Sequence, residues 1–505
     1  MTEPTLNRRD FLKLMAALPL VRLSWQPRPI HRAPKAAADD DRDQPNLLIL
    51  LFDAFSAQHA SLYGYPRHTT PQMERFAERA TVYHAHYTGG SFTNPGTASL
   101  LTGTHPWDHR SMQLYSPMLA SQVKKNFYHA LGDTYYGVGY SHNMIATTLL
   151  YQCMADLDDF MKTRELCLMD GQLADKLFFN DYDIAVWRER GFRGGVALCA
   201  YATSIFYYLF HKEQWLNRRE ALEAQYRERF PKGLPRLNDQ IFILEDAIDW
   251  LRDHLPQLPQ PFVVYFHFLP PHPPHHPSRE FVDLFKHDGW VLPQKPEHPY
   301  TMNHSIEHLR TSAAEYDEFV AYADAEFGRL VDHIEGSELA DNTYTILTSD
   351  HGEMFERGIM GHWTETLYEG LARIPLLIRA PGQRERQDIH TPTSAIDVLP
   401  TLLHFAGRPI PDEYEGRVLP PYRPADAAAQ ADRSVFVIEA KSSPKYGPIQ
   451  GGTLAMIKGP YKLIHYFGYK EIPKPYEMYN LQTDPEELND IYATSPHADD
   501  LREEL

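Results

Sequence analysis

Four side chains in this 505-residue sequence are of types that could hold a metal ion and attack an ester. Asp53 ends the apolar run NLLILLFD, and Asp350 and His351 follow the run TYTILTS. Two carboxylates and an imidazole are a common ligand set for Zn²⁺ or a harder divalent cation, and the hydroxyl of Thr93 would complete a shell of four. A bound cation lowers the pKa of such a hydroxyl and makes it a usable nucleophile. The sequence therefore predicts a metal site with a threonine beside it.

Thr93 lies directly before a predicted helix, in the segment SFTNPGTASLLTG at 91–103. Asn94 is placed as the N-cap, Pro95 as the first helical residue and Gly103 as the stop. The free N–H groups at such a helix start, with Asn94 alongside, favour anions. Thr93 is therefore either a helix-entry residue or a nucleophile whose developing oxyanion is held by the helix start.

Three apolar runs must position these side chains, at 46–53, 262–268 and 343–352. Strands that are apolar on both faces belong to a parallel sheet covered by helices. Helical periodicities lie between the runs, from 241 to 255 and from 316 to 334. The predicted fold class is therefore α/β, a doubly wound and mostly parallel sheet flanked by helices. In such folds polar residues at the carboxyl ends of the strands meet at one edge, and ligands bind there.

The ends of the chain predict an export signal and a small second domain. The stretch NRRDFLKLMAALPLV resembles a twin-arginine signal, and a charged, Pro/Ala-rich linker runs on to residue 44. This predicts an exported protein, periplasmic or extracellular, whose main domain covers 45–425. After the low-complexity join ADAAAQADRS, short strand patterns within 426–505 predict a small antiparallel sheet in an α+β subdomain.

The charge balance restricts the partners. There are 49 Lys and Arg against 67 Asp and Glu, a formal net charge of −18. A surface this acidic argues against nucleic acid as a partner, and an anionic substrate would need a metal or a local cluster of donors. The apolar run at 196–210 is too short to span a bilayer, which leaves a buried helix or a peripheral membrane contact. The sequence predicts no oligomeric state.

Several segments resemble the sulfatases, a family of the alkaline phosphatase superfamily. The motifs NLLILLFDAF, TNPGTASLLTG, PHPP and SDHGEMFERGIMGHW stand in the family's order, and the resemblance covers about residues 45–490. It implies an alkaline phosphatase-like fold in which Asp53, Asp350 and His351 are metal ligands. It also implies that Thr93 stands where sulfatases carry the Cys or Ser that is oxidised to formylglycine.

The same resemblance implies roles for three histidines outside the metal site. His142, in VGYSHN, falls on the histidine of the family's Gly-Lys-Trp-His stretch. His272 falls on a substrate-contacting histidine, and His362 falls on or beside the family's second active-site lysine. These side chains are candidates for oxyanion donors and for the general acid that protonates the leaving group.

Four positions depart from the sulfatase pattern, and each of the last three removes charge from the site. Thr93 cannot become formylglycine, because its β-carbon bears a methyl group. Ala54 replaces the second metal aspartate, Thr97 replaces the arginine that supports the aldehyde, and Tyr140 replaces the first lysine.

These departures favour phosphoryl chemistry over sulfate hydrolysis. A covalent adduct on Thr93 must be cleared by attack at the central atom, which is the usual route for a phosphothreonine intermediate. Superfamily members with a threonine nucleophile are typically phosphodiesterases or phospho-group transferases that use zinc or manganese. We therefore expect a hydrolase or transferase that acts on phosphate, phosphodiester or sulfate esters of small molecules, lipids or glycans. Its cofactor would be one divalent ion, Zn or Mn before Ca or Mg. The alternative is a catalytically silent relative that binds sulfated or phosphorylated glycans.

Overall fold

The computed structural model of the protein describes residues 44–169, 205–237, 240–422 and 433–505. Three predicted features fall wholly or partly outside these ranges. They are the twin-arginine segment with its linker, the apolar run up to residue 204, and the low-complexity join up to residue 432. The domain boundary at 425/426 lies in that join and stays a prediction.

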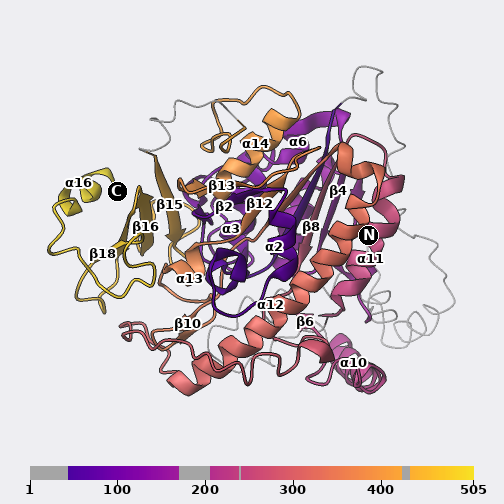
Figure 1. The fold of residues 1–505 in the computed structure, drawn as a ribbon, viewed down its shortest axis with the longest axis horizontal. Helices are drawn as coiled ribbons and strands as arrows, with labels where there is room; N and C mark the ends of the chain where they lie inside the picture. The colour runs from indigo at the N-terminus through magenta and orange to yellow at the C-terminus, as the bar shows by residue number, and fades with distance from the viewer. Residues whose placement is uncertain (1–43, 170–204, 238–239, 423–432) are drawn as a thin grey trace, which may run out of the picture.

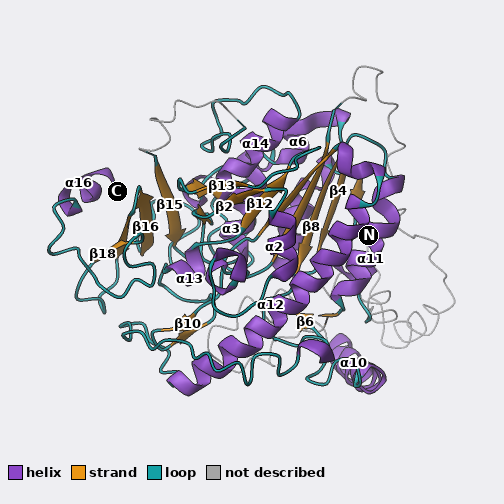
Figure 2. Cartoon of the chain, in the orientation of Figure 1, coloured by secondary structure: helices purple, strands orange, loops and turns teal. Residues whose placement is uncertain are grey.

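An eight-stranded sheet forms the centre of the described chain and is mostly parallel, as predicted (Figure 2). From one edge to the other its strands are β13 (Gln387–Ile389), β2 (Thr81–Tyr83), β12 (Leu376–Arg379), β9 (Thr343–Thr348), β1 (Asn46–Phe52), β8 (Phe262–Phe268), β4 (Tyr136–Ser141) and β5 (Asp159–Phe160). Strand β12 runs antiparallel to both of its neighbours, and the other pairs are parallel. The three apolar runs of the sequence are the adjacent strands β9, β1 and β8, so the residues that follow them emerge at one edge.

Helices cover both faces of the sheet because its central strands are apolar on both sides. All seven residues of β1 are buried, with Leu48 and Leu50 in one core cluster and Leu47 and Ile49 in the other. The first face carries α2 (Pro71–Ala77), α11 (Leu244–His254) and α12 (Ile306–Glu335), with α12 crossing it in Figure 1. The second face carries α3 (Thr93–Thr102), α6 (Phe127–Leu131), α7 (Met144–Cys153) and α14 (Val398–Phe405). The predicted α/β class is confirmed, and α11 and α12 lie where the periodicity placed helices.

A four-stranded antiparallel sheet follows, as the C-terminal strand patterns predicted. Its strands, in order, are β15 (Ser434–Glu439), β16 (Gly452–Lys458), β17 (Tyr461–Phe467) and β18 (Tyr476–Asn480). This sheet shares a hydrophobic cluster with the main domain, in which Val437 and Ile464 pack with Tyr87 and Leu371. At its inner edge the N–H of Ile438 donates to the carbonyl of Gly89 at 3.2 Å, just before the start of α3. The C-terminal sheet is therefore attached to the loop that leads to Thr93.

The remaining α-helices and strands of the described chain are shorter, except for one long helix at the surface. They are α4 (Pro106–His109), α5 (Ala120–Val123), α10 (Ile205–Tyr226), α13 (Glu369–Ala372) and α16 (Ala498–Glu504), with the strand pairs β3 (His86–Tyr87) and β14 (Thr393–Ser394), β6 (Arg236–Leu237) and β7 (Gln240–Ile241), and β10 (Phe355–Glu356) and β11 (Ile359–Met360). Within the described ranges, no helix combines the length and the apolar character needed to cross a membrane.

Candidate active site

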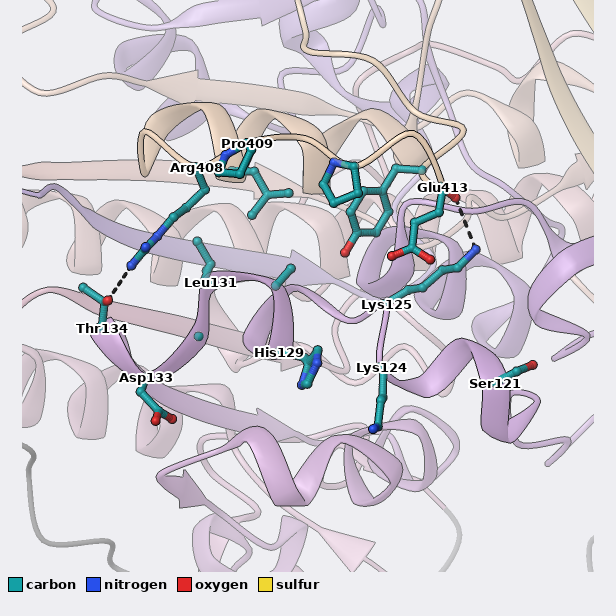
Figure 3. A pocket seen from close by; sticks show the side chains of 15 residues that line it. Ser121, Lys124, Lys125, His129, Leu131, Asp133, Thr134, Arg408, Pro409 and Glu413 are labelled. Carbon is teal, nitrogen blue, oxygen red and sulfur yellow. Dashed lines mark hydrogen bonds between the residues drawn. The ribbon is translucent and has the colours of Figure 1, made fainter.

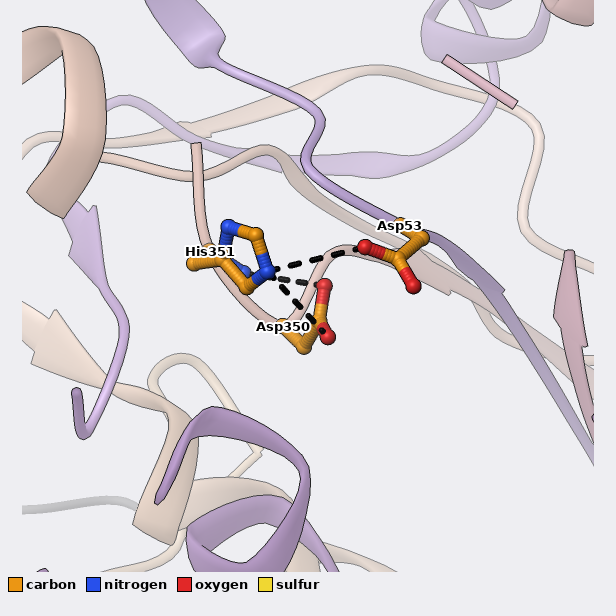
Figure 4. A group of neighbouring side chains, drawn as sticks. All are labelled: Asp53, Asp350 and His351. Atoms are coloured by element: carbon orange, nitrogen blue, oxygen red, sulfur yellow. Dashed lines mark hydrogen bonds and ion pairs between the residues drawn. The ribbon is translucent and has the colours of Figure 1, made fainter. Parts of the chain in front are cut away.

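The three predicted metal ligands lie together at the carboxyl ends of two neighbouring strands (Figure 4). Asp53 follows β1, and Asp350 and His351 follow β9, which is paired in parallel with β1. The Nε2 atom of His351 is 3.5 Å from Asp53 Oδ1 and 3.7 Å from Asp350 Oδ2. All three side chains are fully buried. The sheet therefore gathers two carboxylates and an imidazole into one buried cluster.

The hydrogen bonds of Asp53 leave one of its oxygens facing this cluster. Its Oδ2 accepts from Asn143 Nδ2 at 2.5 Å and pairs with His267 Nε2 at 2.9 Å. Its Oδ1 is buried and has no hydrogen-bond partner among the described residues. A buried carboxylate oxygen without a partner is costly, and a cation beside His351 Nε2 would remove that cost. The residues present therefore fit a divalent metal ion.

The pKa values of the three side chains in this cluster also favour a bound cation. Burial and the negative charge of Asp53 raise the pKa of Asp350 to about 7. Burial also tends to raise the pKa of Asp53, but the nearby His272, His267 and His351 outweigh it and the pKa is lowered. Burial, with the charge of His362, lowers the pKa of His351 and keeps its imidazole neutral. Two carboxylates and a neutral imidazole in a dry site attract a cation strongly.

Metal affinity should therefore rise with pH. A cation must displace the proton that Asp350 holds below pH 7, so we expect affinity to fall by about tenfold for each pH unit below 7 and to level off above it. Titration calorimetry of metal-free protein between pH 5.5 and 8.5, in buffers with different ionisation enthalpies, measures both the affinity and the proton release. A constant affinity across this range would show that Asp350 binds no proton that the metal displaces.

Helix α3 begins two residues earlier than the sequence indicated, and the predicted capping role of Asn94 is wrong. Thr93 is the first residue of the helix, and the N-cap is Phe92, whose side chain makes no capping bond. Pro95 still lies in the first turn, where its missing N–H costs nothing. The side chain of Asn94 instead bonds to Tyr115 N at 3.0 Å and to Ser116 O at 3.1 Å. Asn94 therefore holds a neighbouring loop, and only its backbone N–H remains at the helix start.

Thr93 lies beside the metal-ligand cluster with 2% of its surface exposed. Its Oγ1 is 3.4 Å from His351 Nε2 and 3.2 Å from Asn143 Nδ2. A close approach of α3 to the end of β9 makes this possible, because a Cβ at Gly96 would lie 2.1 Å from the carbonyl oxygen of Asp350. The sequence placed Thr93 beside the predicted metal ligands, and in the structure its hydroxyl lies next to one of them, His351.

His272 and His362 form the more open side of the site. Their ring centroids are 5.0 Å apart, and the His362 ring is 4.4 Å from that of His351. His272 Nδ1 donates to the carbonyl of Pro273 at 2.7 Å, and burial lowers its pKa. His362 Nδ1 pairs with Glu353 at 2.8 Å, and this carboxylate raises the pKa of His362 against the effect of burial. Two adjacent imidazoles thus have pKa values moved in opposite directions.

His142 lies behind the site. Its ring stacks on Phe242 at 4.2 Å, and its Nδ1 accepts weakly from the N–H of Leu269 at 3.4 Å. Burial, with a smaller effect of His267, lowers the pKa of His142 to about 3. The next residue, Asn143, is the one that contacts both Asp53 and Thr93.

Neutral donors fill two of the positions that depart from the sulfatase pattern. The N–H of Ala54 donates to Asp350 Oδ1 at 3.3 Å, from a left-handed backbone with a φ of +59°. Thr97 Oγ1 donates to Asp350 Oδ2 at 3.4 Å. At the third position, Tyr140 is fully buried and its hydroxyl donates to the carbonyl of Thr163, away from this cluster.

Sequence reasoning missed two residues that contact Asp53, namely Asn143 and His267. His267 is in β8, where Tyr265 is hydrogen-bonded to its Nδ1 at 3.0 Å while its Nε2 faces Asp53. Asn143 follows β4 by two residues. Both lie at carboxyl ends of strands, so the rule that predicted the metal ligands could also have identified them.

A separate pocket, with a volume of about 680 Å³, opens at the opposite end of the strands from the metal ligands (Figure 3). Lys124, Lys125, His129 and Arg408 are among the side chains that line it. It lies at the amino end of β4, whereas the metal ligands lie beyond the carboxyl ends of the neighbouring strands, about 20 Å away by the length of a six-residue strand. It contains none of the residues predicted to do chemistry.

Comparison with known proteins supplies a family. Residues 45–408 match the family model described as Sulfatase, and residues 361–505 match one described as N-sulphoglucosamine sulphohydrolase, C-terminal. The multifunctional alkaline phosphatase superfamily protein PehA of Trinickia caryophylli is 24% identical over 85% of this chain and 86% of its own length. The choline-sulfatase of Rhizobium meliloti (strain 1021) is 23% identical over 89% and 82%. Arylsulfatase K of Canis lupus familiaris is 27% identical, but the alignment spans about half of each protein.

Solved structures share the fold. The phosphonate monoester hydrolase of Silicibacter pomeroyi superposes with a TM-score of 0.62 at 21% identity, covering 91% of this chain and 93% of its own. A protein solved with its substrate, D-glucosamine-2-N,6-O-disulfate, also gives 0.62, at 17% identity over 91% and 96%.

Proposed function

Because the chain belongs to the sulfatase family, we propose that it is a metal-dependent ester hydrolase or transferase in which Thr93 is the nucleophile. We propose further that it prefers phosphate-type esters, above all phosphodiesters, to sulfate esters. One observation carries this: Thr93 Oγ1 lies 3.4 Å from the imidazole nitrogen that also faces Asp53 and Asp350. A silent relative would have no need to keep a buried hydroxyl in contact with an intact ligand cluster.

Asp53, Asp350, His351 and Thr93 would hold the ion. When bound, a divalent cation lowers the pKa of the Thr93 hydroxyl and offsets negative charge on the transferred group. The mixture of oxygen and imidazole ligands supports Zn²⁺ or Mn²⁺ before Ca²⁺ or Mg²⁺.

Thr93 then attacks the phosphorus atom. The hydroxyl proton, made more acidic when a cation is bound, is lost to solvent. A bond then forms between Oγ1 and phosphorus, and the bond from phosphorus to the leaving oxygen breaks. The N–H groups of Thr93 and Asn94, in the first turn of α3, have no carbonyl partner within the helix and can bind the phosphoryl oxygens. Water then attacks phosphorus and releases Thr93, and an alcohol in place of water gives transfer.

His362 and His272, the two outer histidines, have different roles in proton transfer. The contact with Glu353 favours the imidazolium form of His362, which can protonate the leaving oxygen. Burial lowers the pKa of His272 and so favours its neutral form, and no described residue is hydrogen-bonded to its Nε2, so this nitrogen can take a proton from the attacking water. Neighbouring groups with pKa values moved apart are a common arrangement for an acid and a base.

The preference for phosphorus follows from the nucleophile. Thr93 lacks the second hydroxyl of a hydrated aldehyde, so its adduct can leave only by a second attack on the central atom. The relatives and structural neighbours carry names of both phosphorus- and sulfate-ester enzymes, so both kinds of substrate have to be compared.

We expect kcat/KM for bis(4-nitrophenyl) phosphate and for a 4-nitrophenyl phosphonate monoester to exceed that for 4-nitrophenyl sulfate by about 10²-fold or more, that is about 2.7 kcal/mol or more in barrier. Release of 4-nitrophenolate by metal-loaded protein measures all three with one chromophore. A faster reaction with the sulfate would overturn the phosphoryl preference. No turnover of any ester, together with binding of a sulfated or phosphorylated glycan, would favour the silent relative.

A further inference from the structure

We propose that Asn143 is a further catalytic residue: its side-chain amide orients the Thr93 hydroxyl and hydrogen-bonds the oxygen that attacks. This inference rests on the proposed role of Thr93 as nucleophile. It also gives Asn143 a second task, which is to fix Asp53 so that one carboxylate oxygen stays free for the metal.

Both N–H groups and the oxygen of the Asn143 side chain take part in hydrogen bonds. Its Nδ2 donates to Asp53 Oδ2 at 2.5 Å and to Thr93 Oγ1 at 3.2 Å. Its Oδ1 accepts from the N–H of Ile145 at 2.8 Å and caps helix α7. The side chain is fully buried. It thus ties the end of β1, the start of α3 and the start of α7 to one point.

The positions of oxygen and nitrogen in this amide follow from its partners. The exchanged orientation would place Oδ1 against the carboxylate of Asp53 and Nδ2 against the N–H of Ile145, which are two repulsive contacts. The amide therefore presents N–H groups, and only N–H groups, to Asp53 and Thr93.

The N–H that Asn143 donates to Thr93 determines the direction in which the hydroxyl hydrogen of Thr93 points. The Oγ1 atom accepts from the amide, so its hydrogen must point elsewhere. His351 Nδ1 donates to the carbonyl of Gly352 at 2.9 Å, which leaves His351 Nε2 as an acceptor 3.4 Å from Oγ1. Without a bound ion the hydroxyl proton is thus directed at the ligand cluster, at the place where a cation held by these ligands would replace it. When that proton leaves, the amide donor is already in place for the alkoxide, and a hydrogen bond to an anion is roughly twice as strong as a neutral one.

The same amide acts on Asp53. Because Asn143 and His267 both contact Oδ2, the carboxylate is held with Oδ1 toward His351 Nε2. A neutral amide thus links nucleophile and metal ligand in a site where Ala54 and Thr97 stand in place of charged residues.

Asn143→Ser and Asn143→Asp test this while keeping the cap of α7, since Ser and Asp are both good N-cap residues. Serine is too short to bond to Thr93, and aspartate offers a second carboxylate to Asp53 instead of a donor. We expect kcat of N143S on bis(4-nitrophenyl) phosphate to fall by about 10²-fold with little change in KM, and that of N143D to fall further. The affinity of metal-free N143S for Zn²⁺, measured by calorimetry, should fall by about tenfold.

Asn126→Ser is the matched control. Asn126 is also buried and also caps a helix, α6, by accepting from His129 N at 3.1 Å, and it also donates to a carboxylate, Asp156, at 2.9 Å. Unlike Asn143, Asn126 is not hydrogen-bonded to Asp53 or to Thr93. N126S should lose as much thermal stability as N143S and keep the kcat and Zn²⁺ affinity of the wild type.

A kcat of N143S within about threefold of wild type, or an N143D that is as active as N143S or more so, would overturn the catalytic role of Asn143. Failure of the proposed function is distinguishable, because the wild type itself would then turn over no ester. In that case equal Zn²⁺ affinities of wild type and N143S would overturn the remaining claim about Asp53.

Discussion

Replacement of Thr93 by alanine should reduce kcat on a phosphodiester by at least about 10³-fold, because it removes the attacking oxygen and one metal ligand together. Thr93→Ser should keep a measurable part of the activity, since it keeps a hydroxyl at the same position. The loss of the methyl group leaves that hydroxyl with more rotamer freedom, so a partial loss is expected. Release of 4-nitrophenolate by matched, metal-loaded proteins measures all three.

The covalent step has its own readout. Acid quenching of wild-type protein during turnover, followed by mass spectrometry, should find a phosphoryl adduct on the peptide that contains Thr93, and T93A should show none. Wild-type activity in T93A would remove Thr93 from the mechanism. An adduct on another residue would assign the nucleophile elsewhere.

Asp350→Asn should have opposite effects on metal binding and on the stability of the metal-free protein. It should weaken metal affinity by about 10²-fold or more, because a change outside the ligand set alone can cost up to that much. It should also stabilise the metal-free fold at pH 8 by about 1–3 kcal/mol, because it removes one of two repelling buried carboxylates. The amide oxygen can still accept from the N–H of Ala54 and of His351, as the carboxylate does.

The stability gain should depend on pH in a direction that the raised pKa of Asp350 fixes. Between the usual pKa of an aspartate and about 7, the folded protein binds a proton that the unfolded chain releases, so ionisation of Asp350 destabilises the fold as pH rises through this range. The advantage of D350N should be large at pH 8 and nearly absent at pH 4. Thermal unfolding with a chelator at several pH values measures it, and a D350N that is less stable than wild type at pH 8 would contradict the proposed repulsion.

The central fold could be predicted from the sequence because burial leaves a plain pattern. β9, β1 and β8 are apolar on both sides, and this occurs mainly in covered parallel sheets. The helices α11 and α12 show a three- and four-residue spacing of apolar residues that are buried in the structure. Asp53, Asp350 and His351 could be grouped because the ends of such strands meet at one edge.

The details that could not be predicted depend on side-chain direction. Nothing in VGYSHN shows that His142 turns toward Phe242 while Asn143 turns toward Asp53 and Thr93. Asn94 has the type and the place of a helix cap, but Tyr115 and Ser116, some twenty residues later, offer it better partners. These contacts are long-range, so a local pattern does not contain them.

The bond from Ile438 to Gly89 has a consequence for the nascent chain. During synthesis the segment with Thr93 leaves the ribosome early, whereas β15, which anchors its approach loop, is translated near the end. A chain halted between His351 and β15 would have both aspartates, His351 and Thr93 but would lack the strand that holds the loop in place. The chain should therefore become able to catalyse its reaction only late in translation. Shortened versions that end before β15 should be poor starting points for engineering.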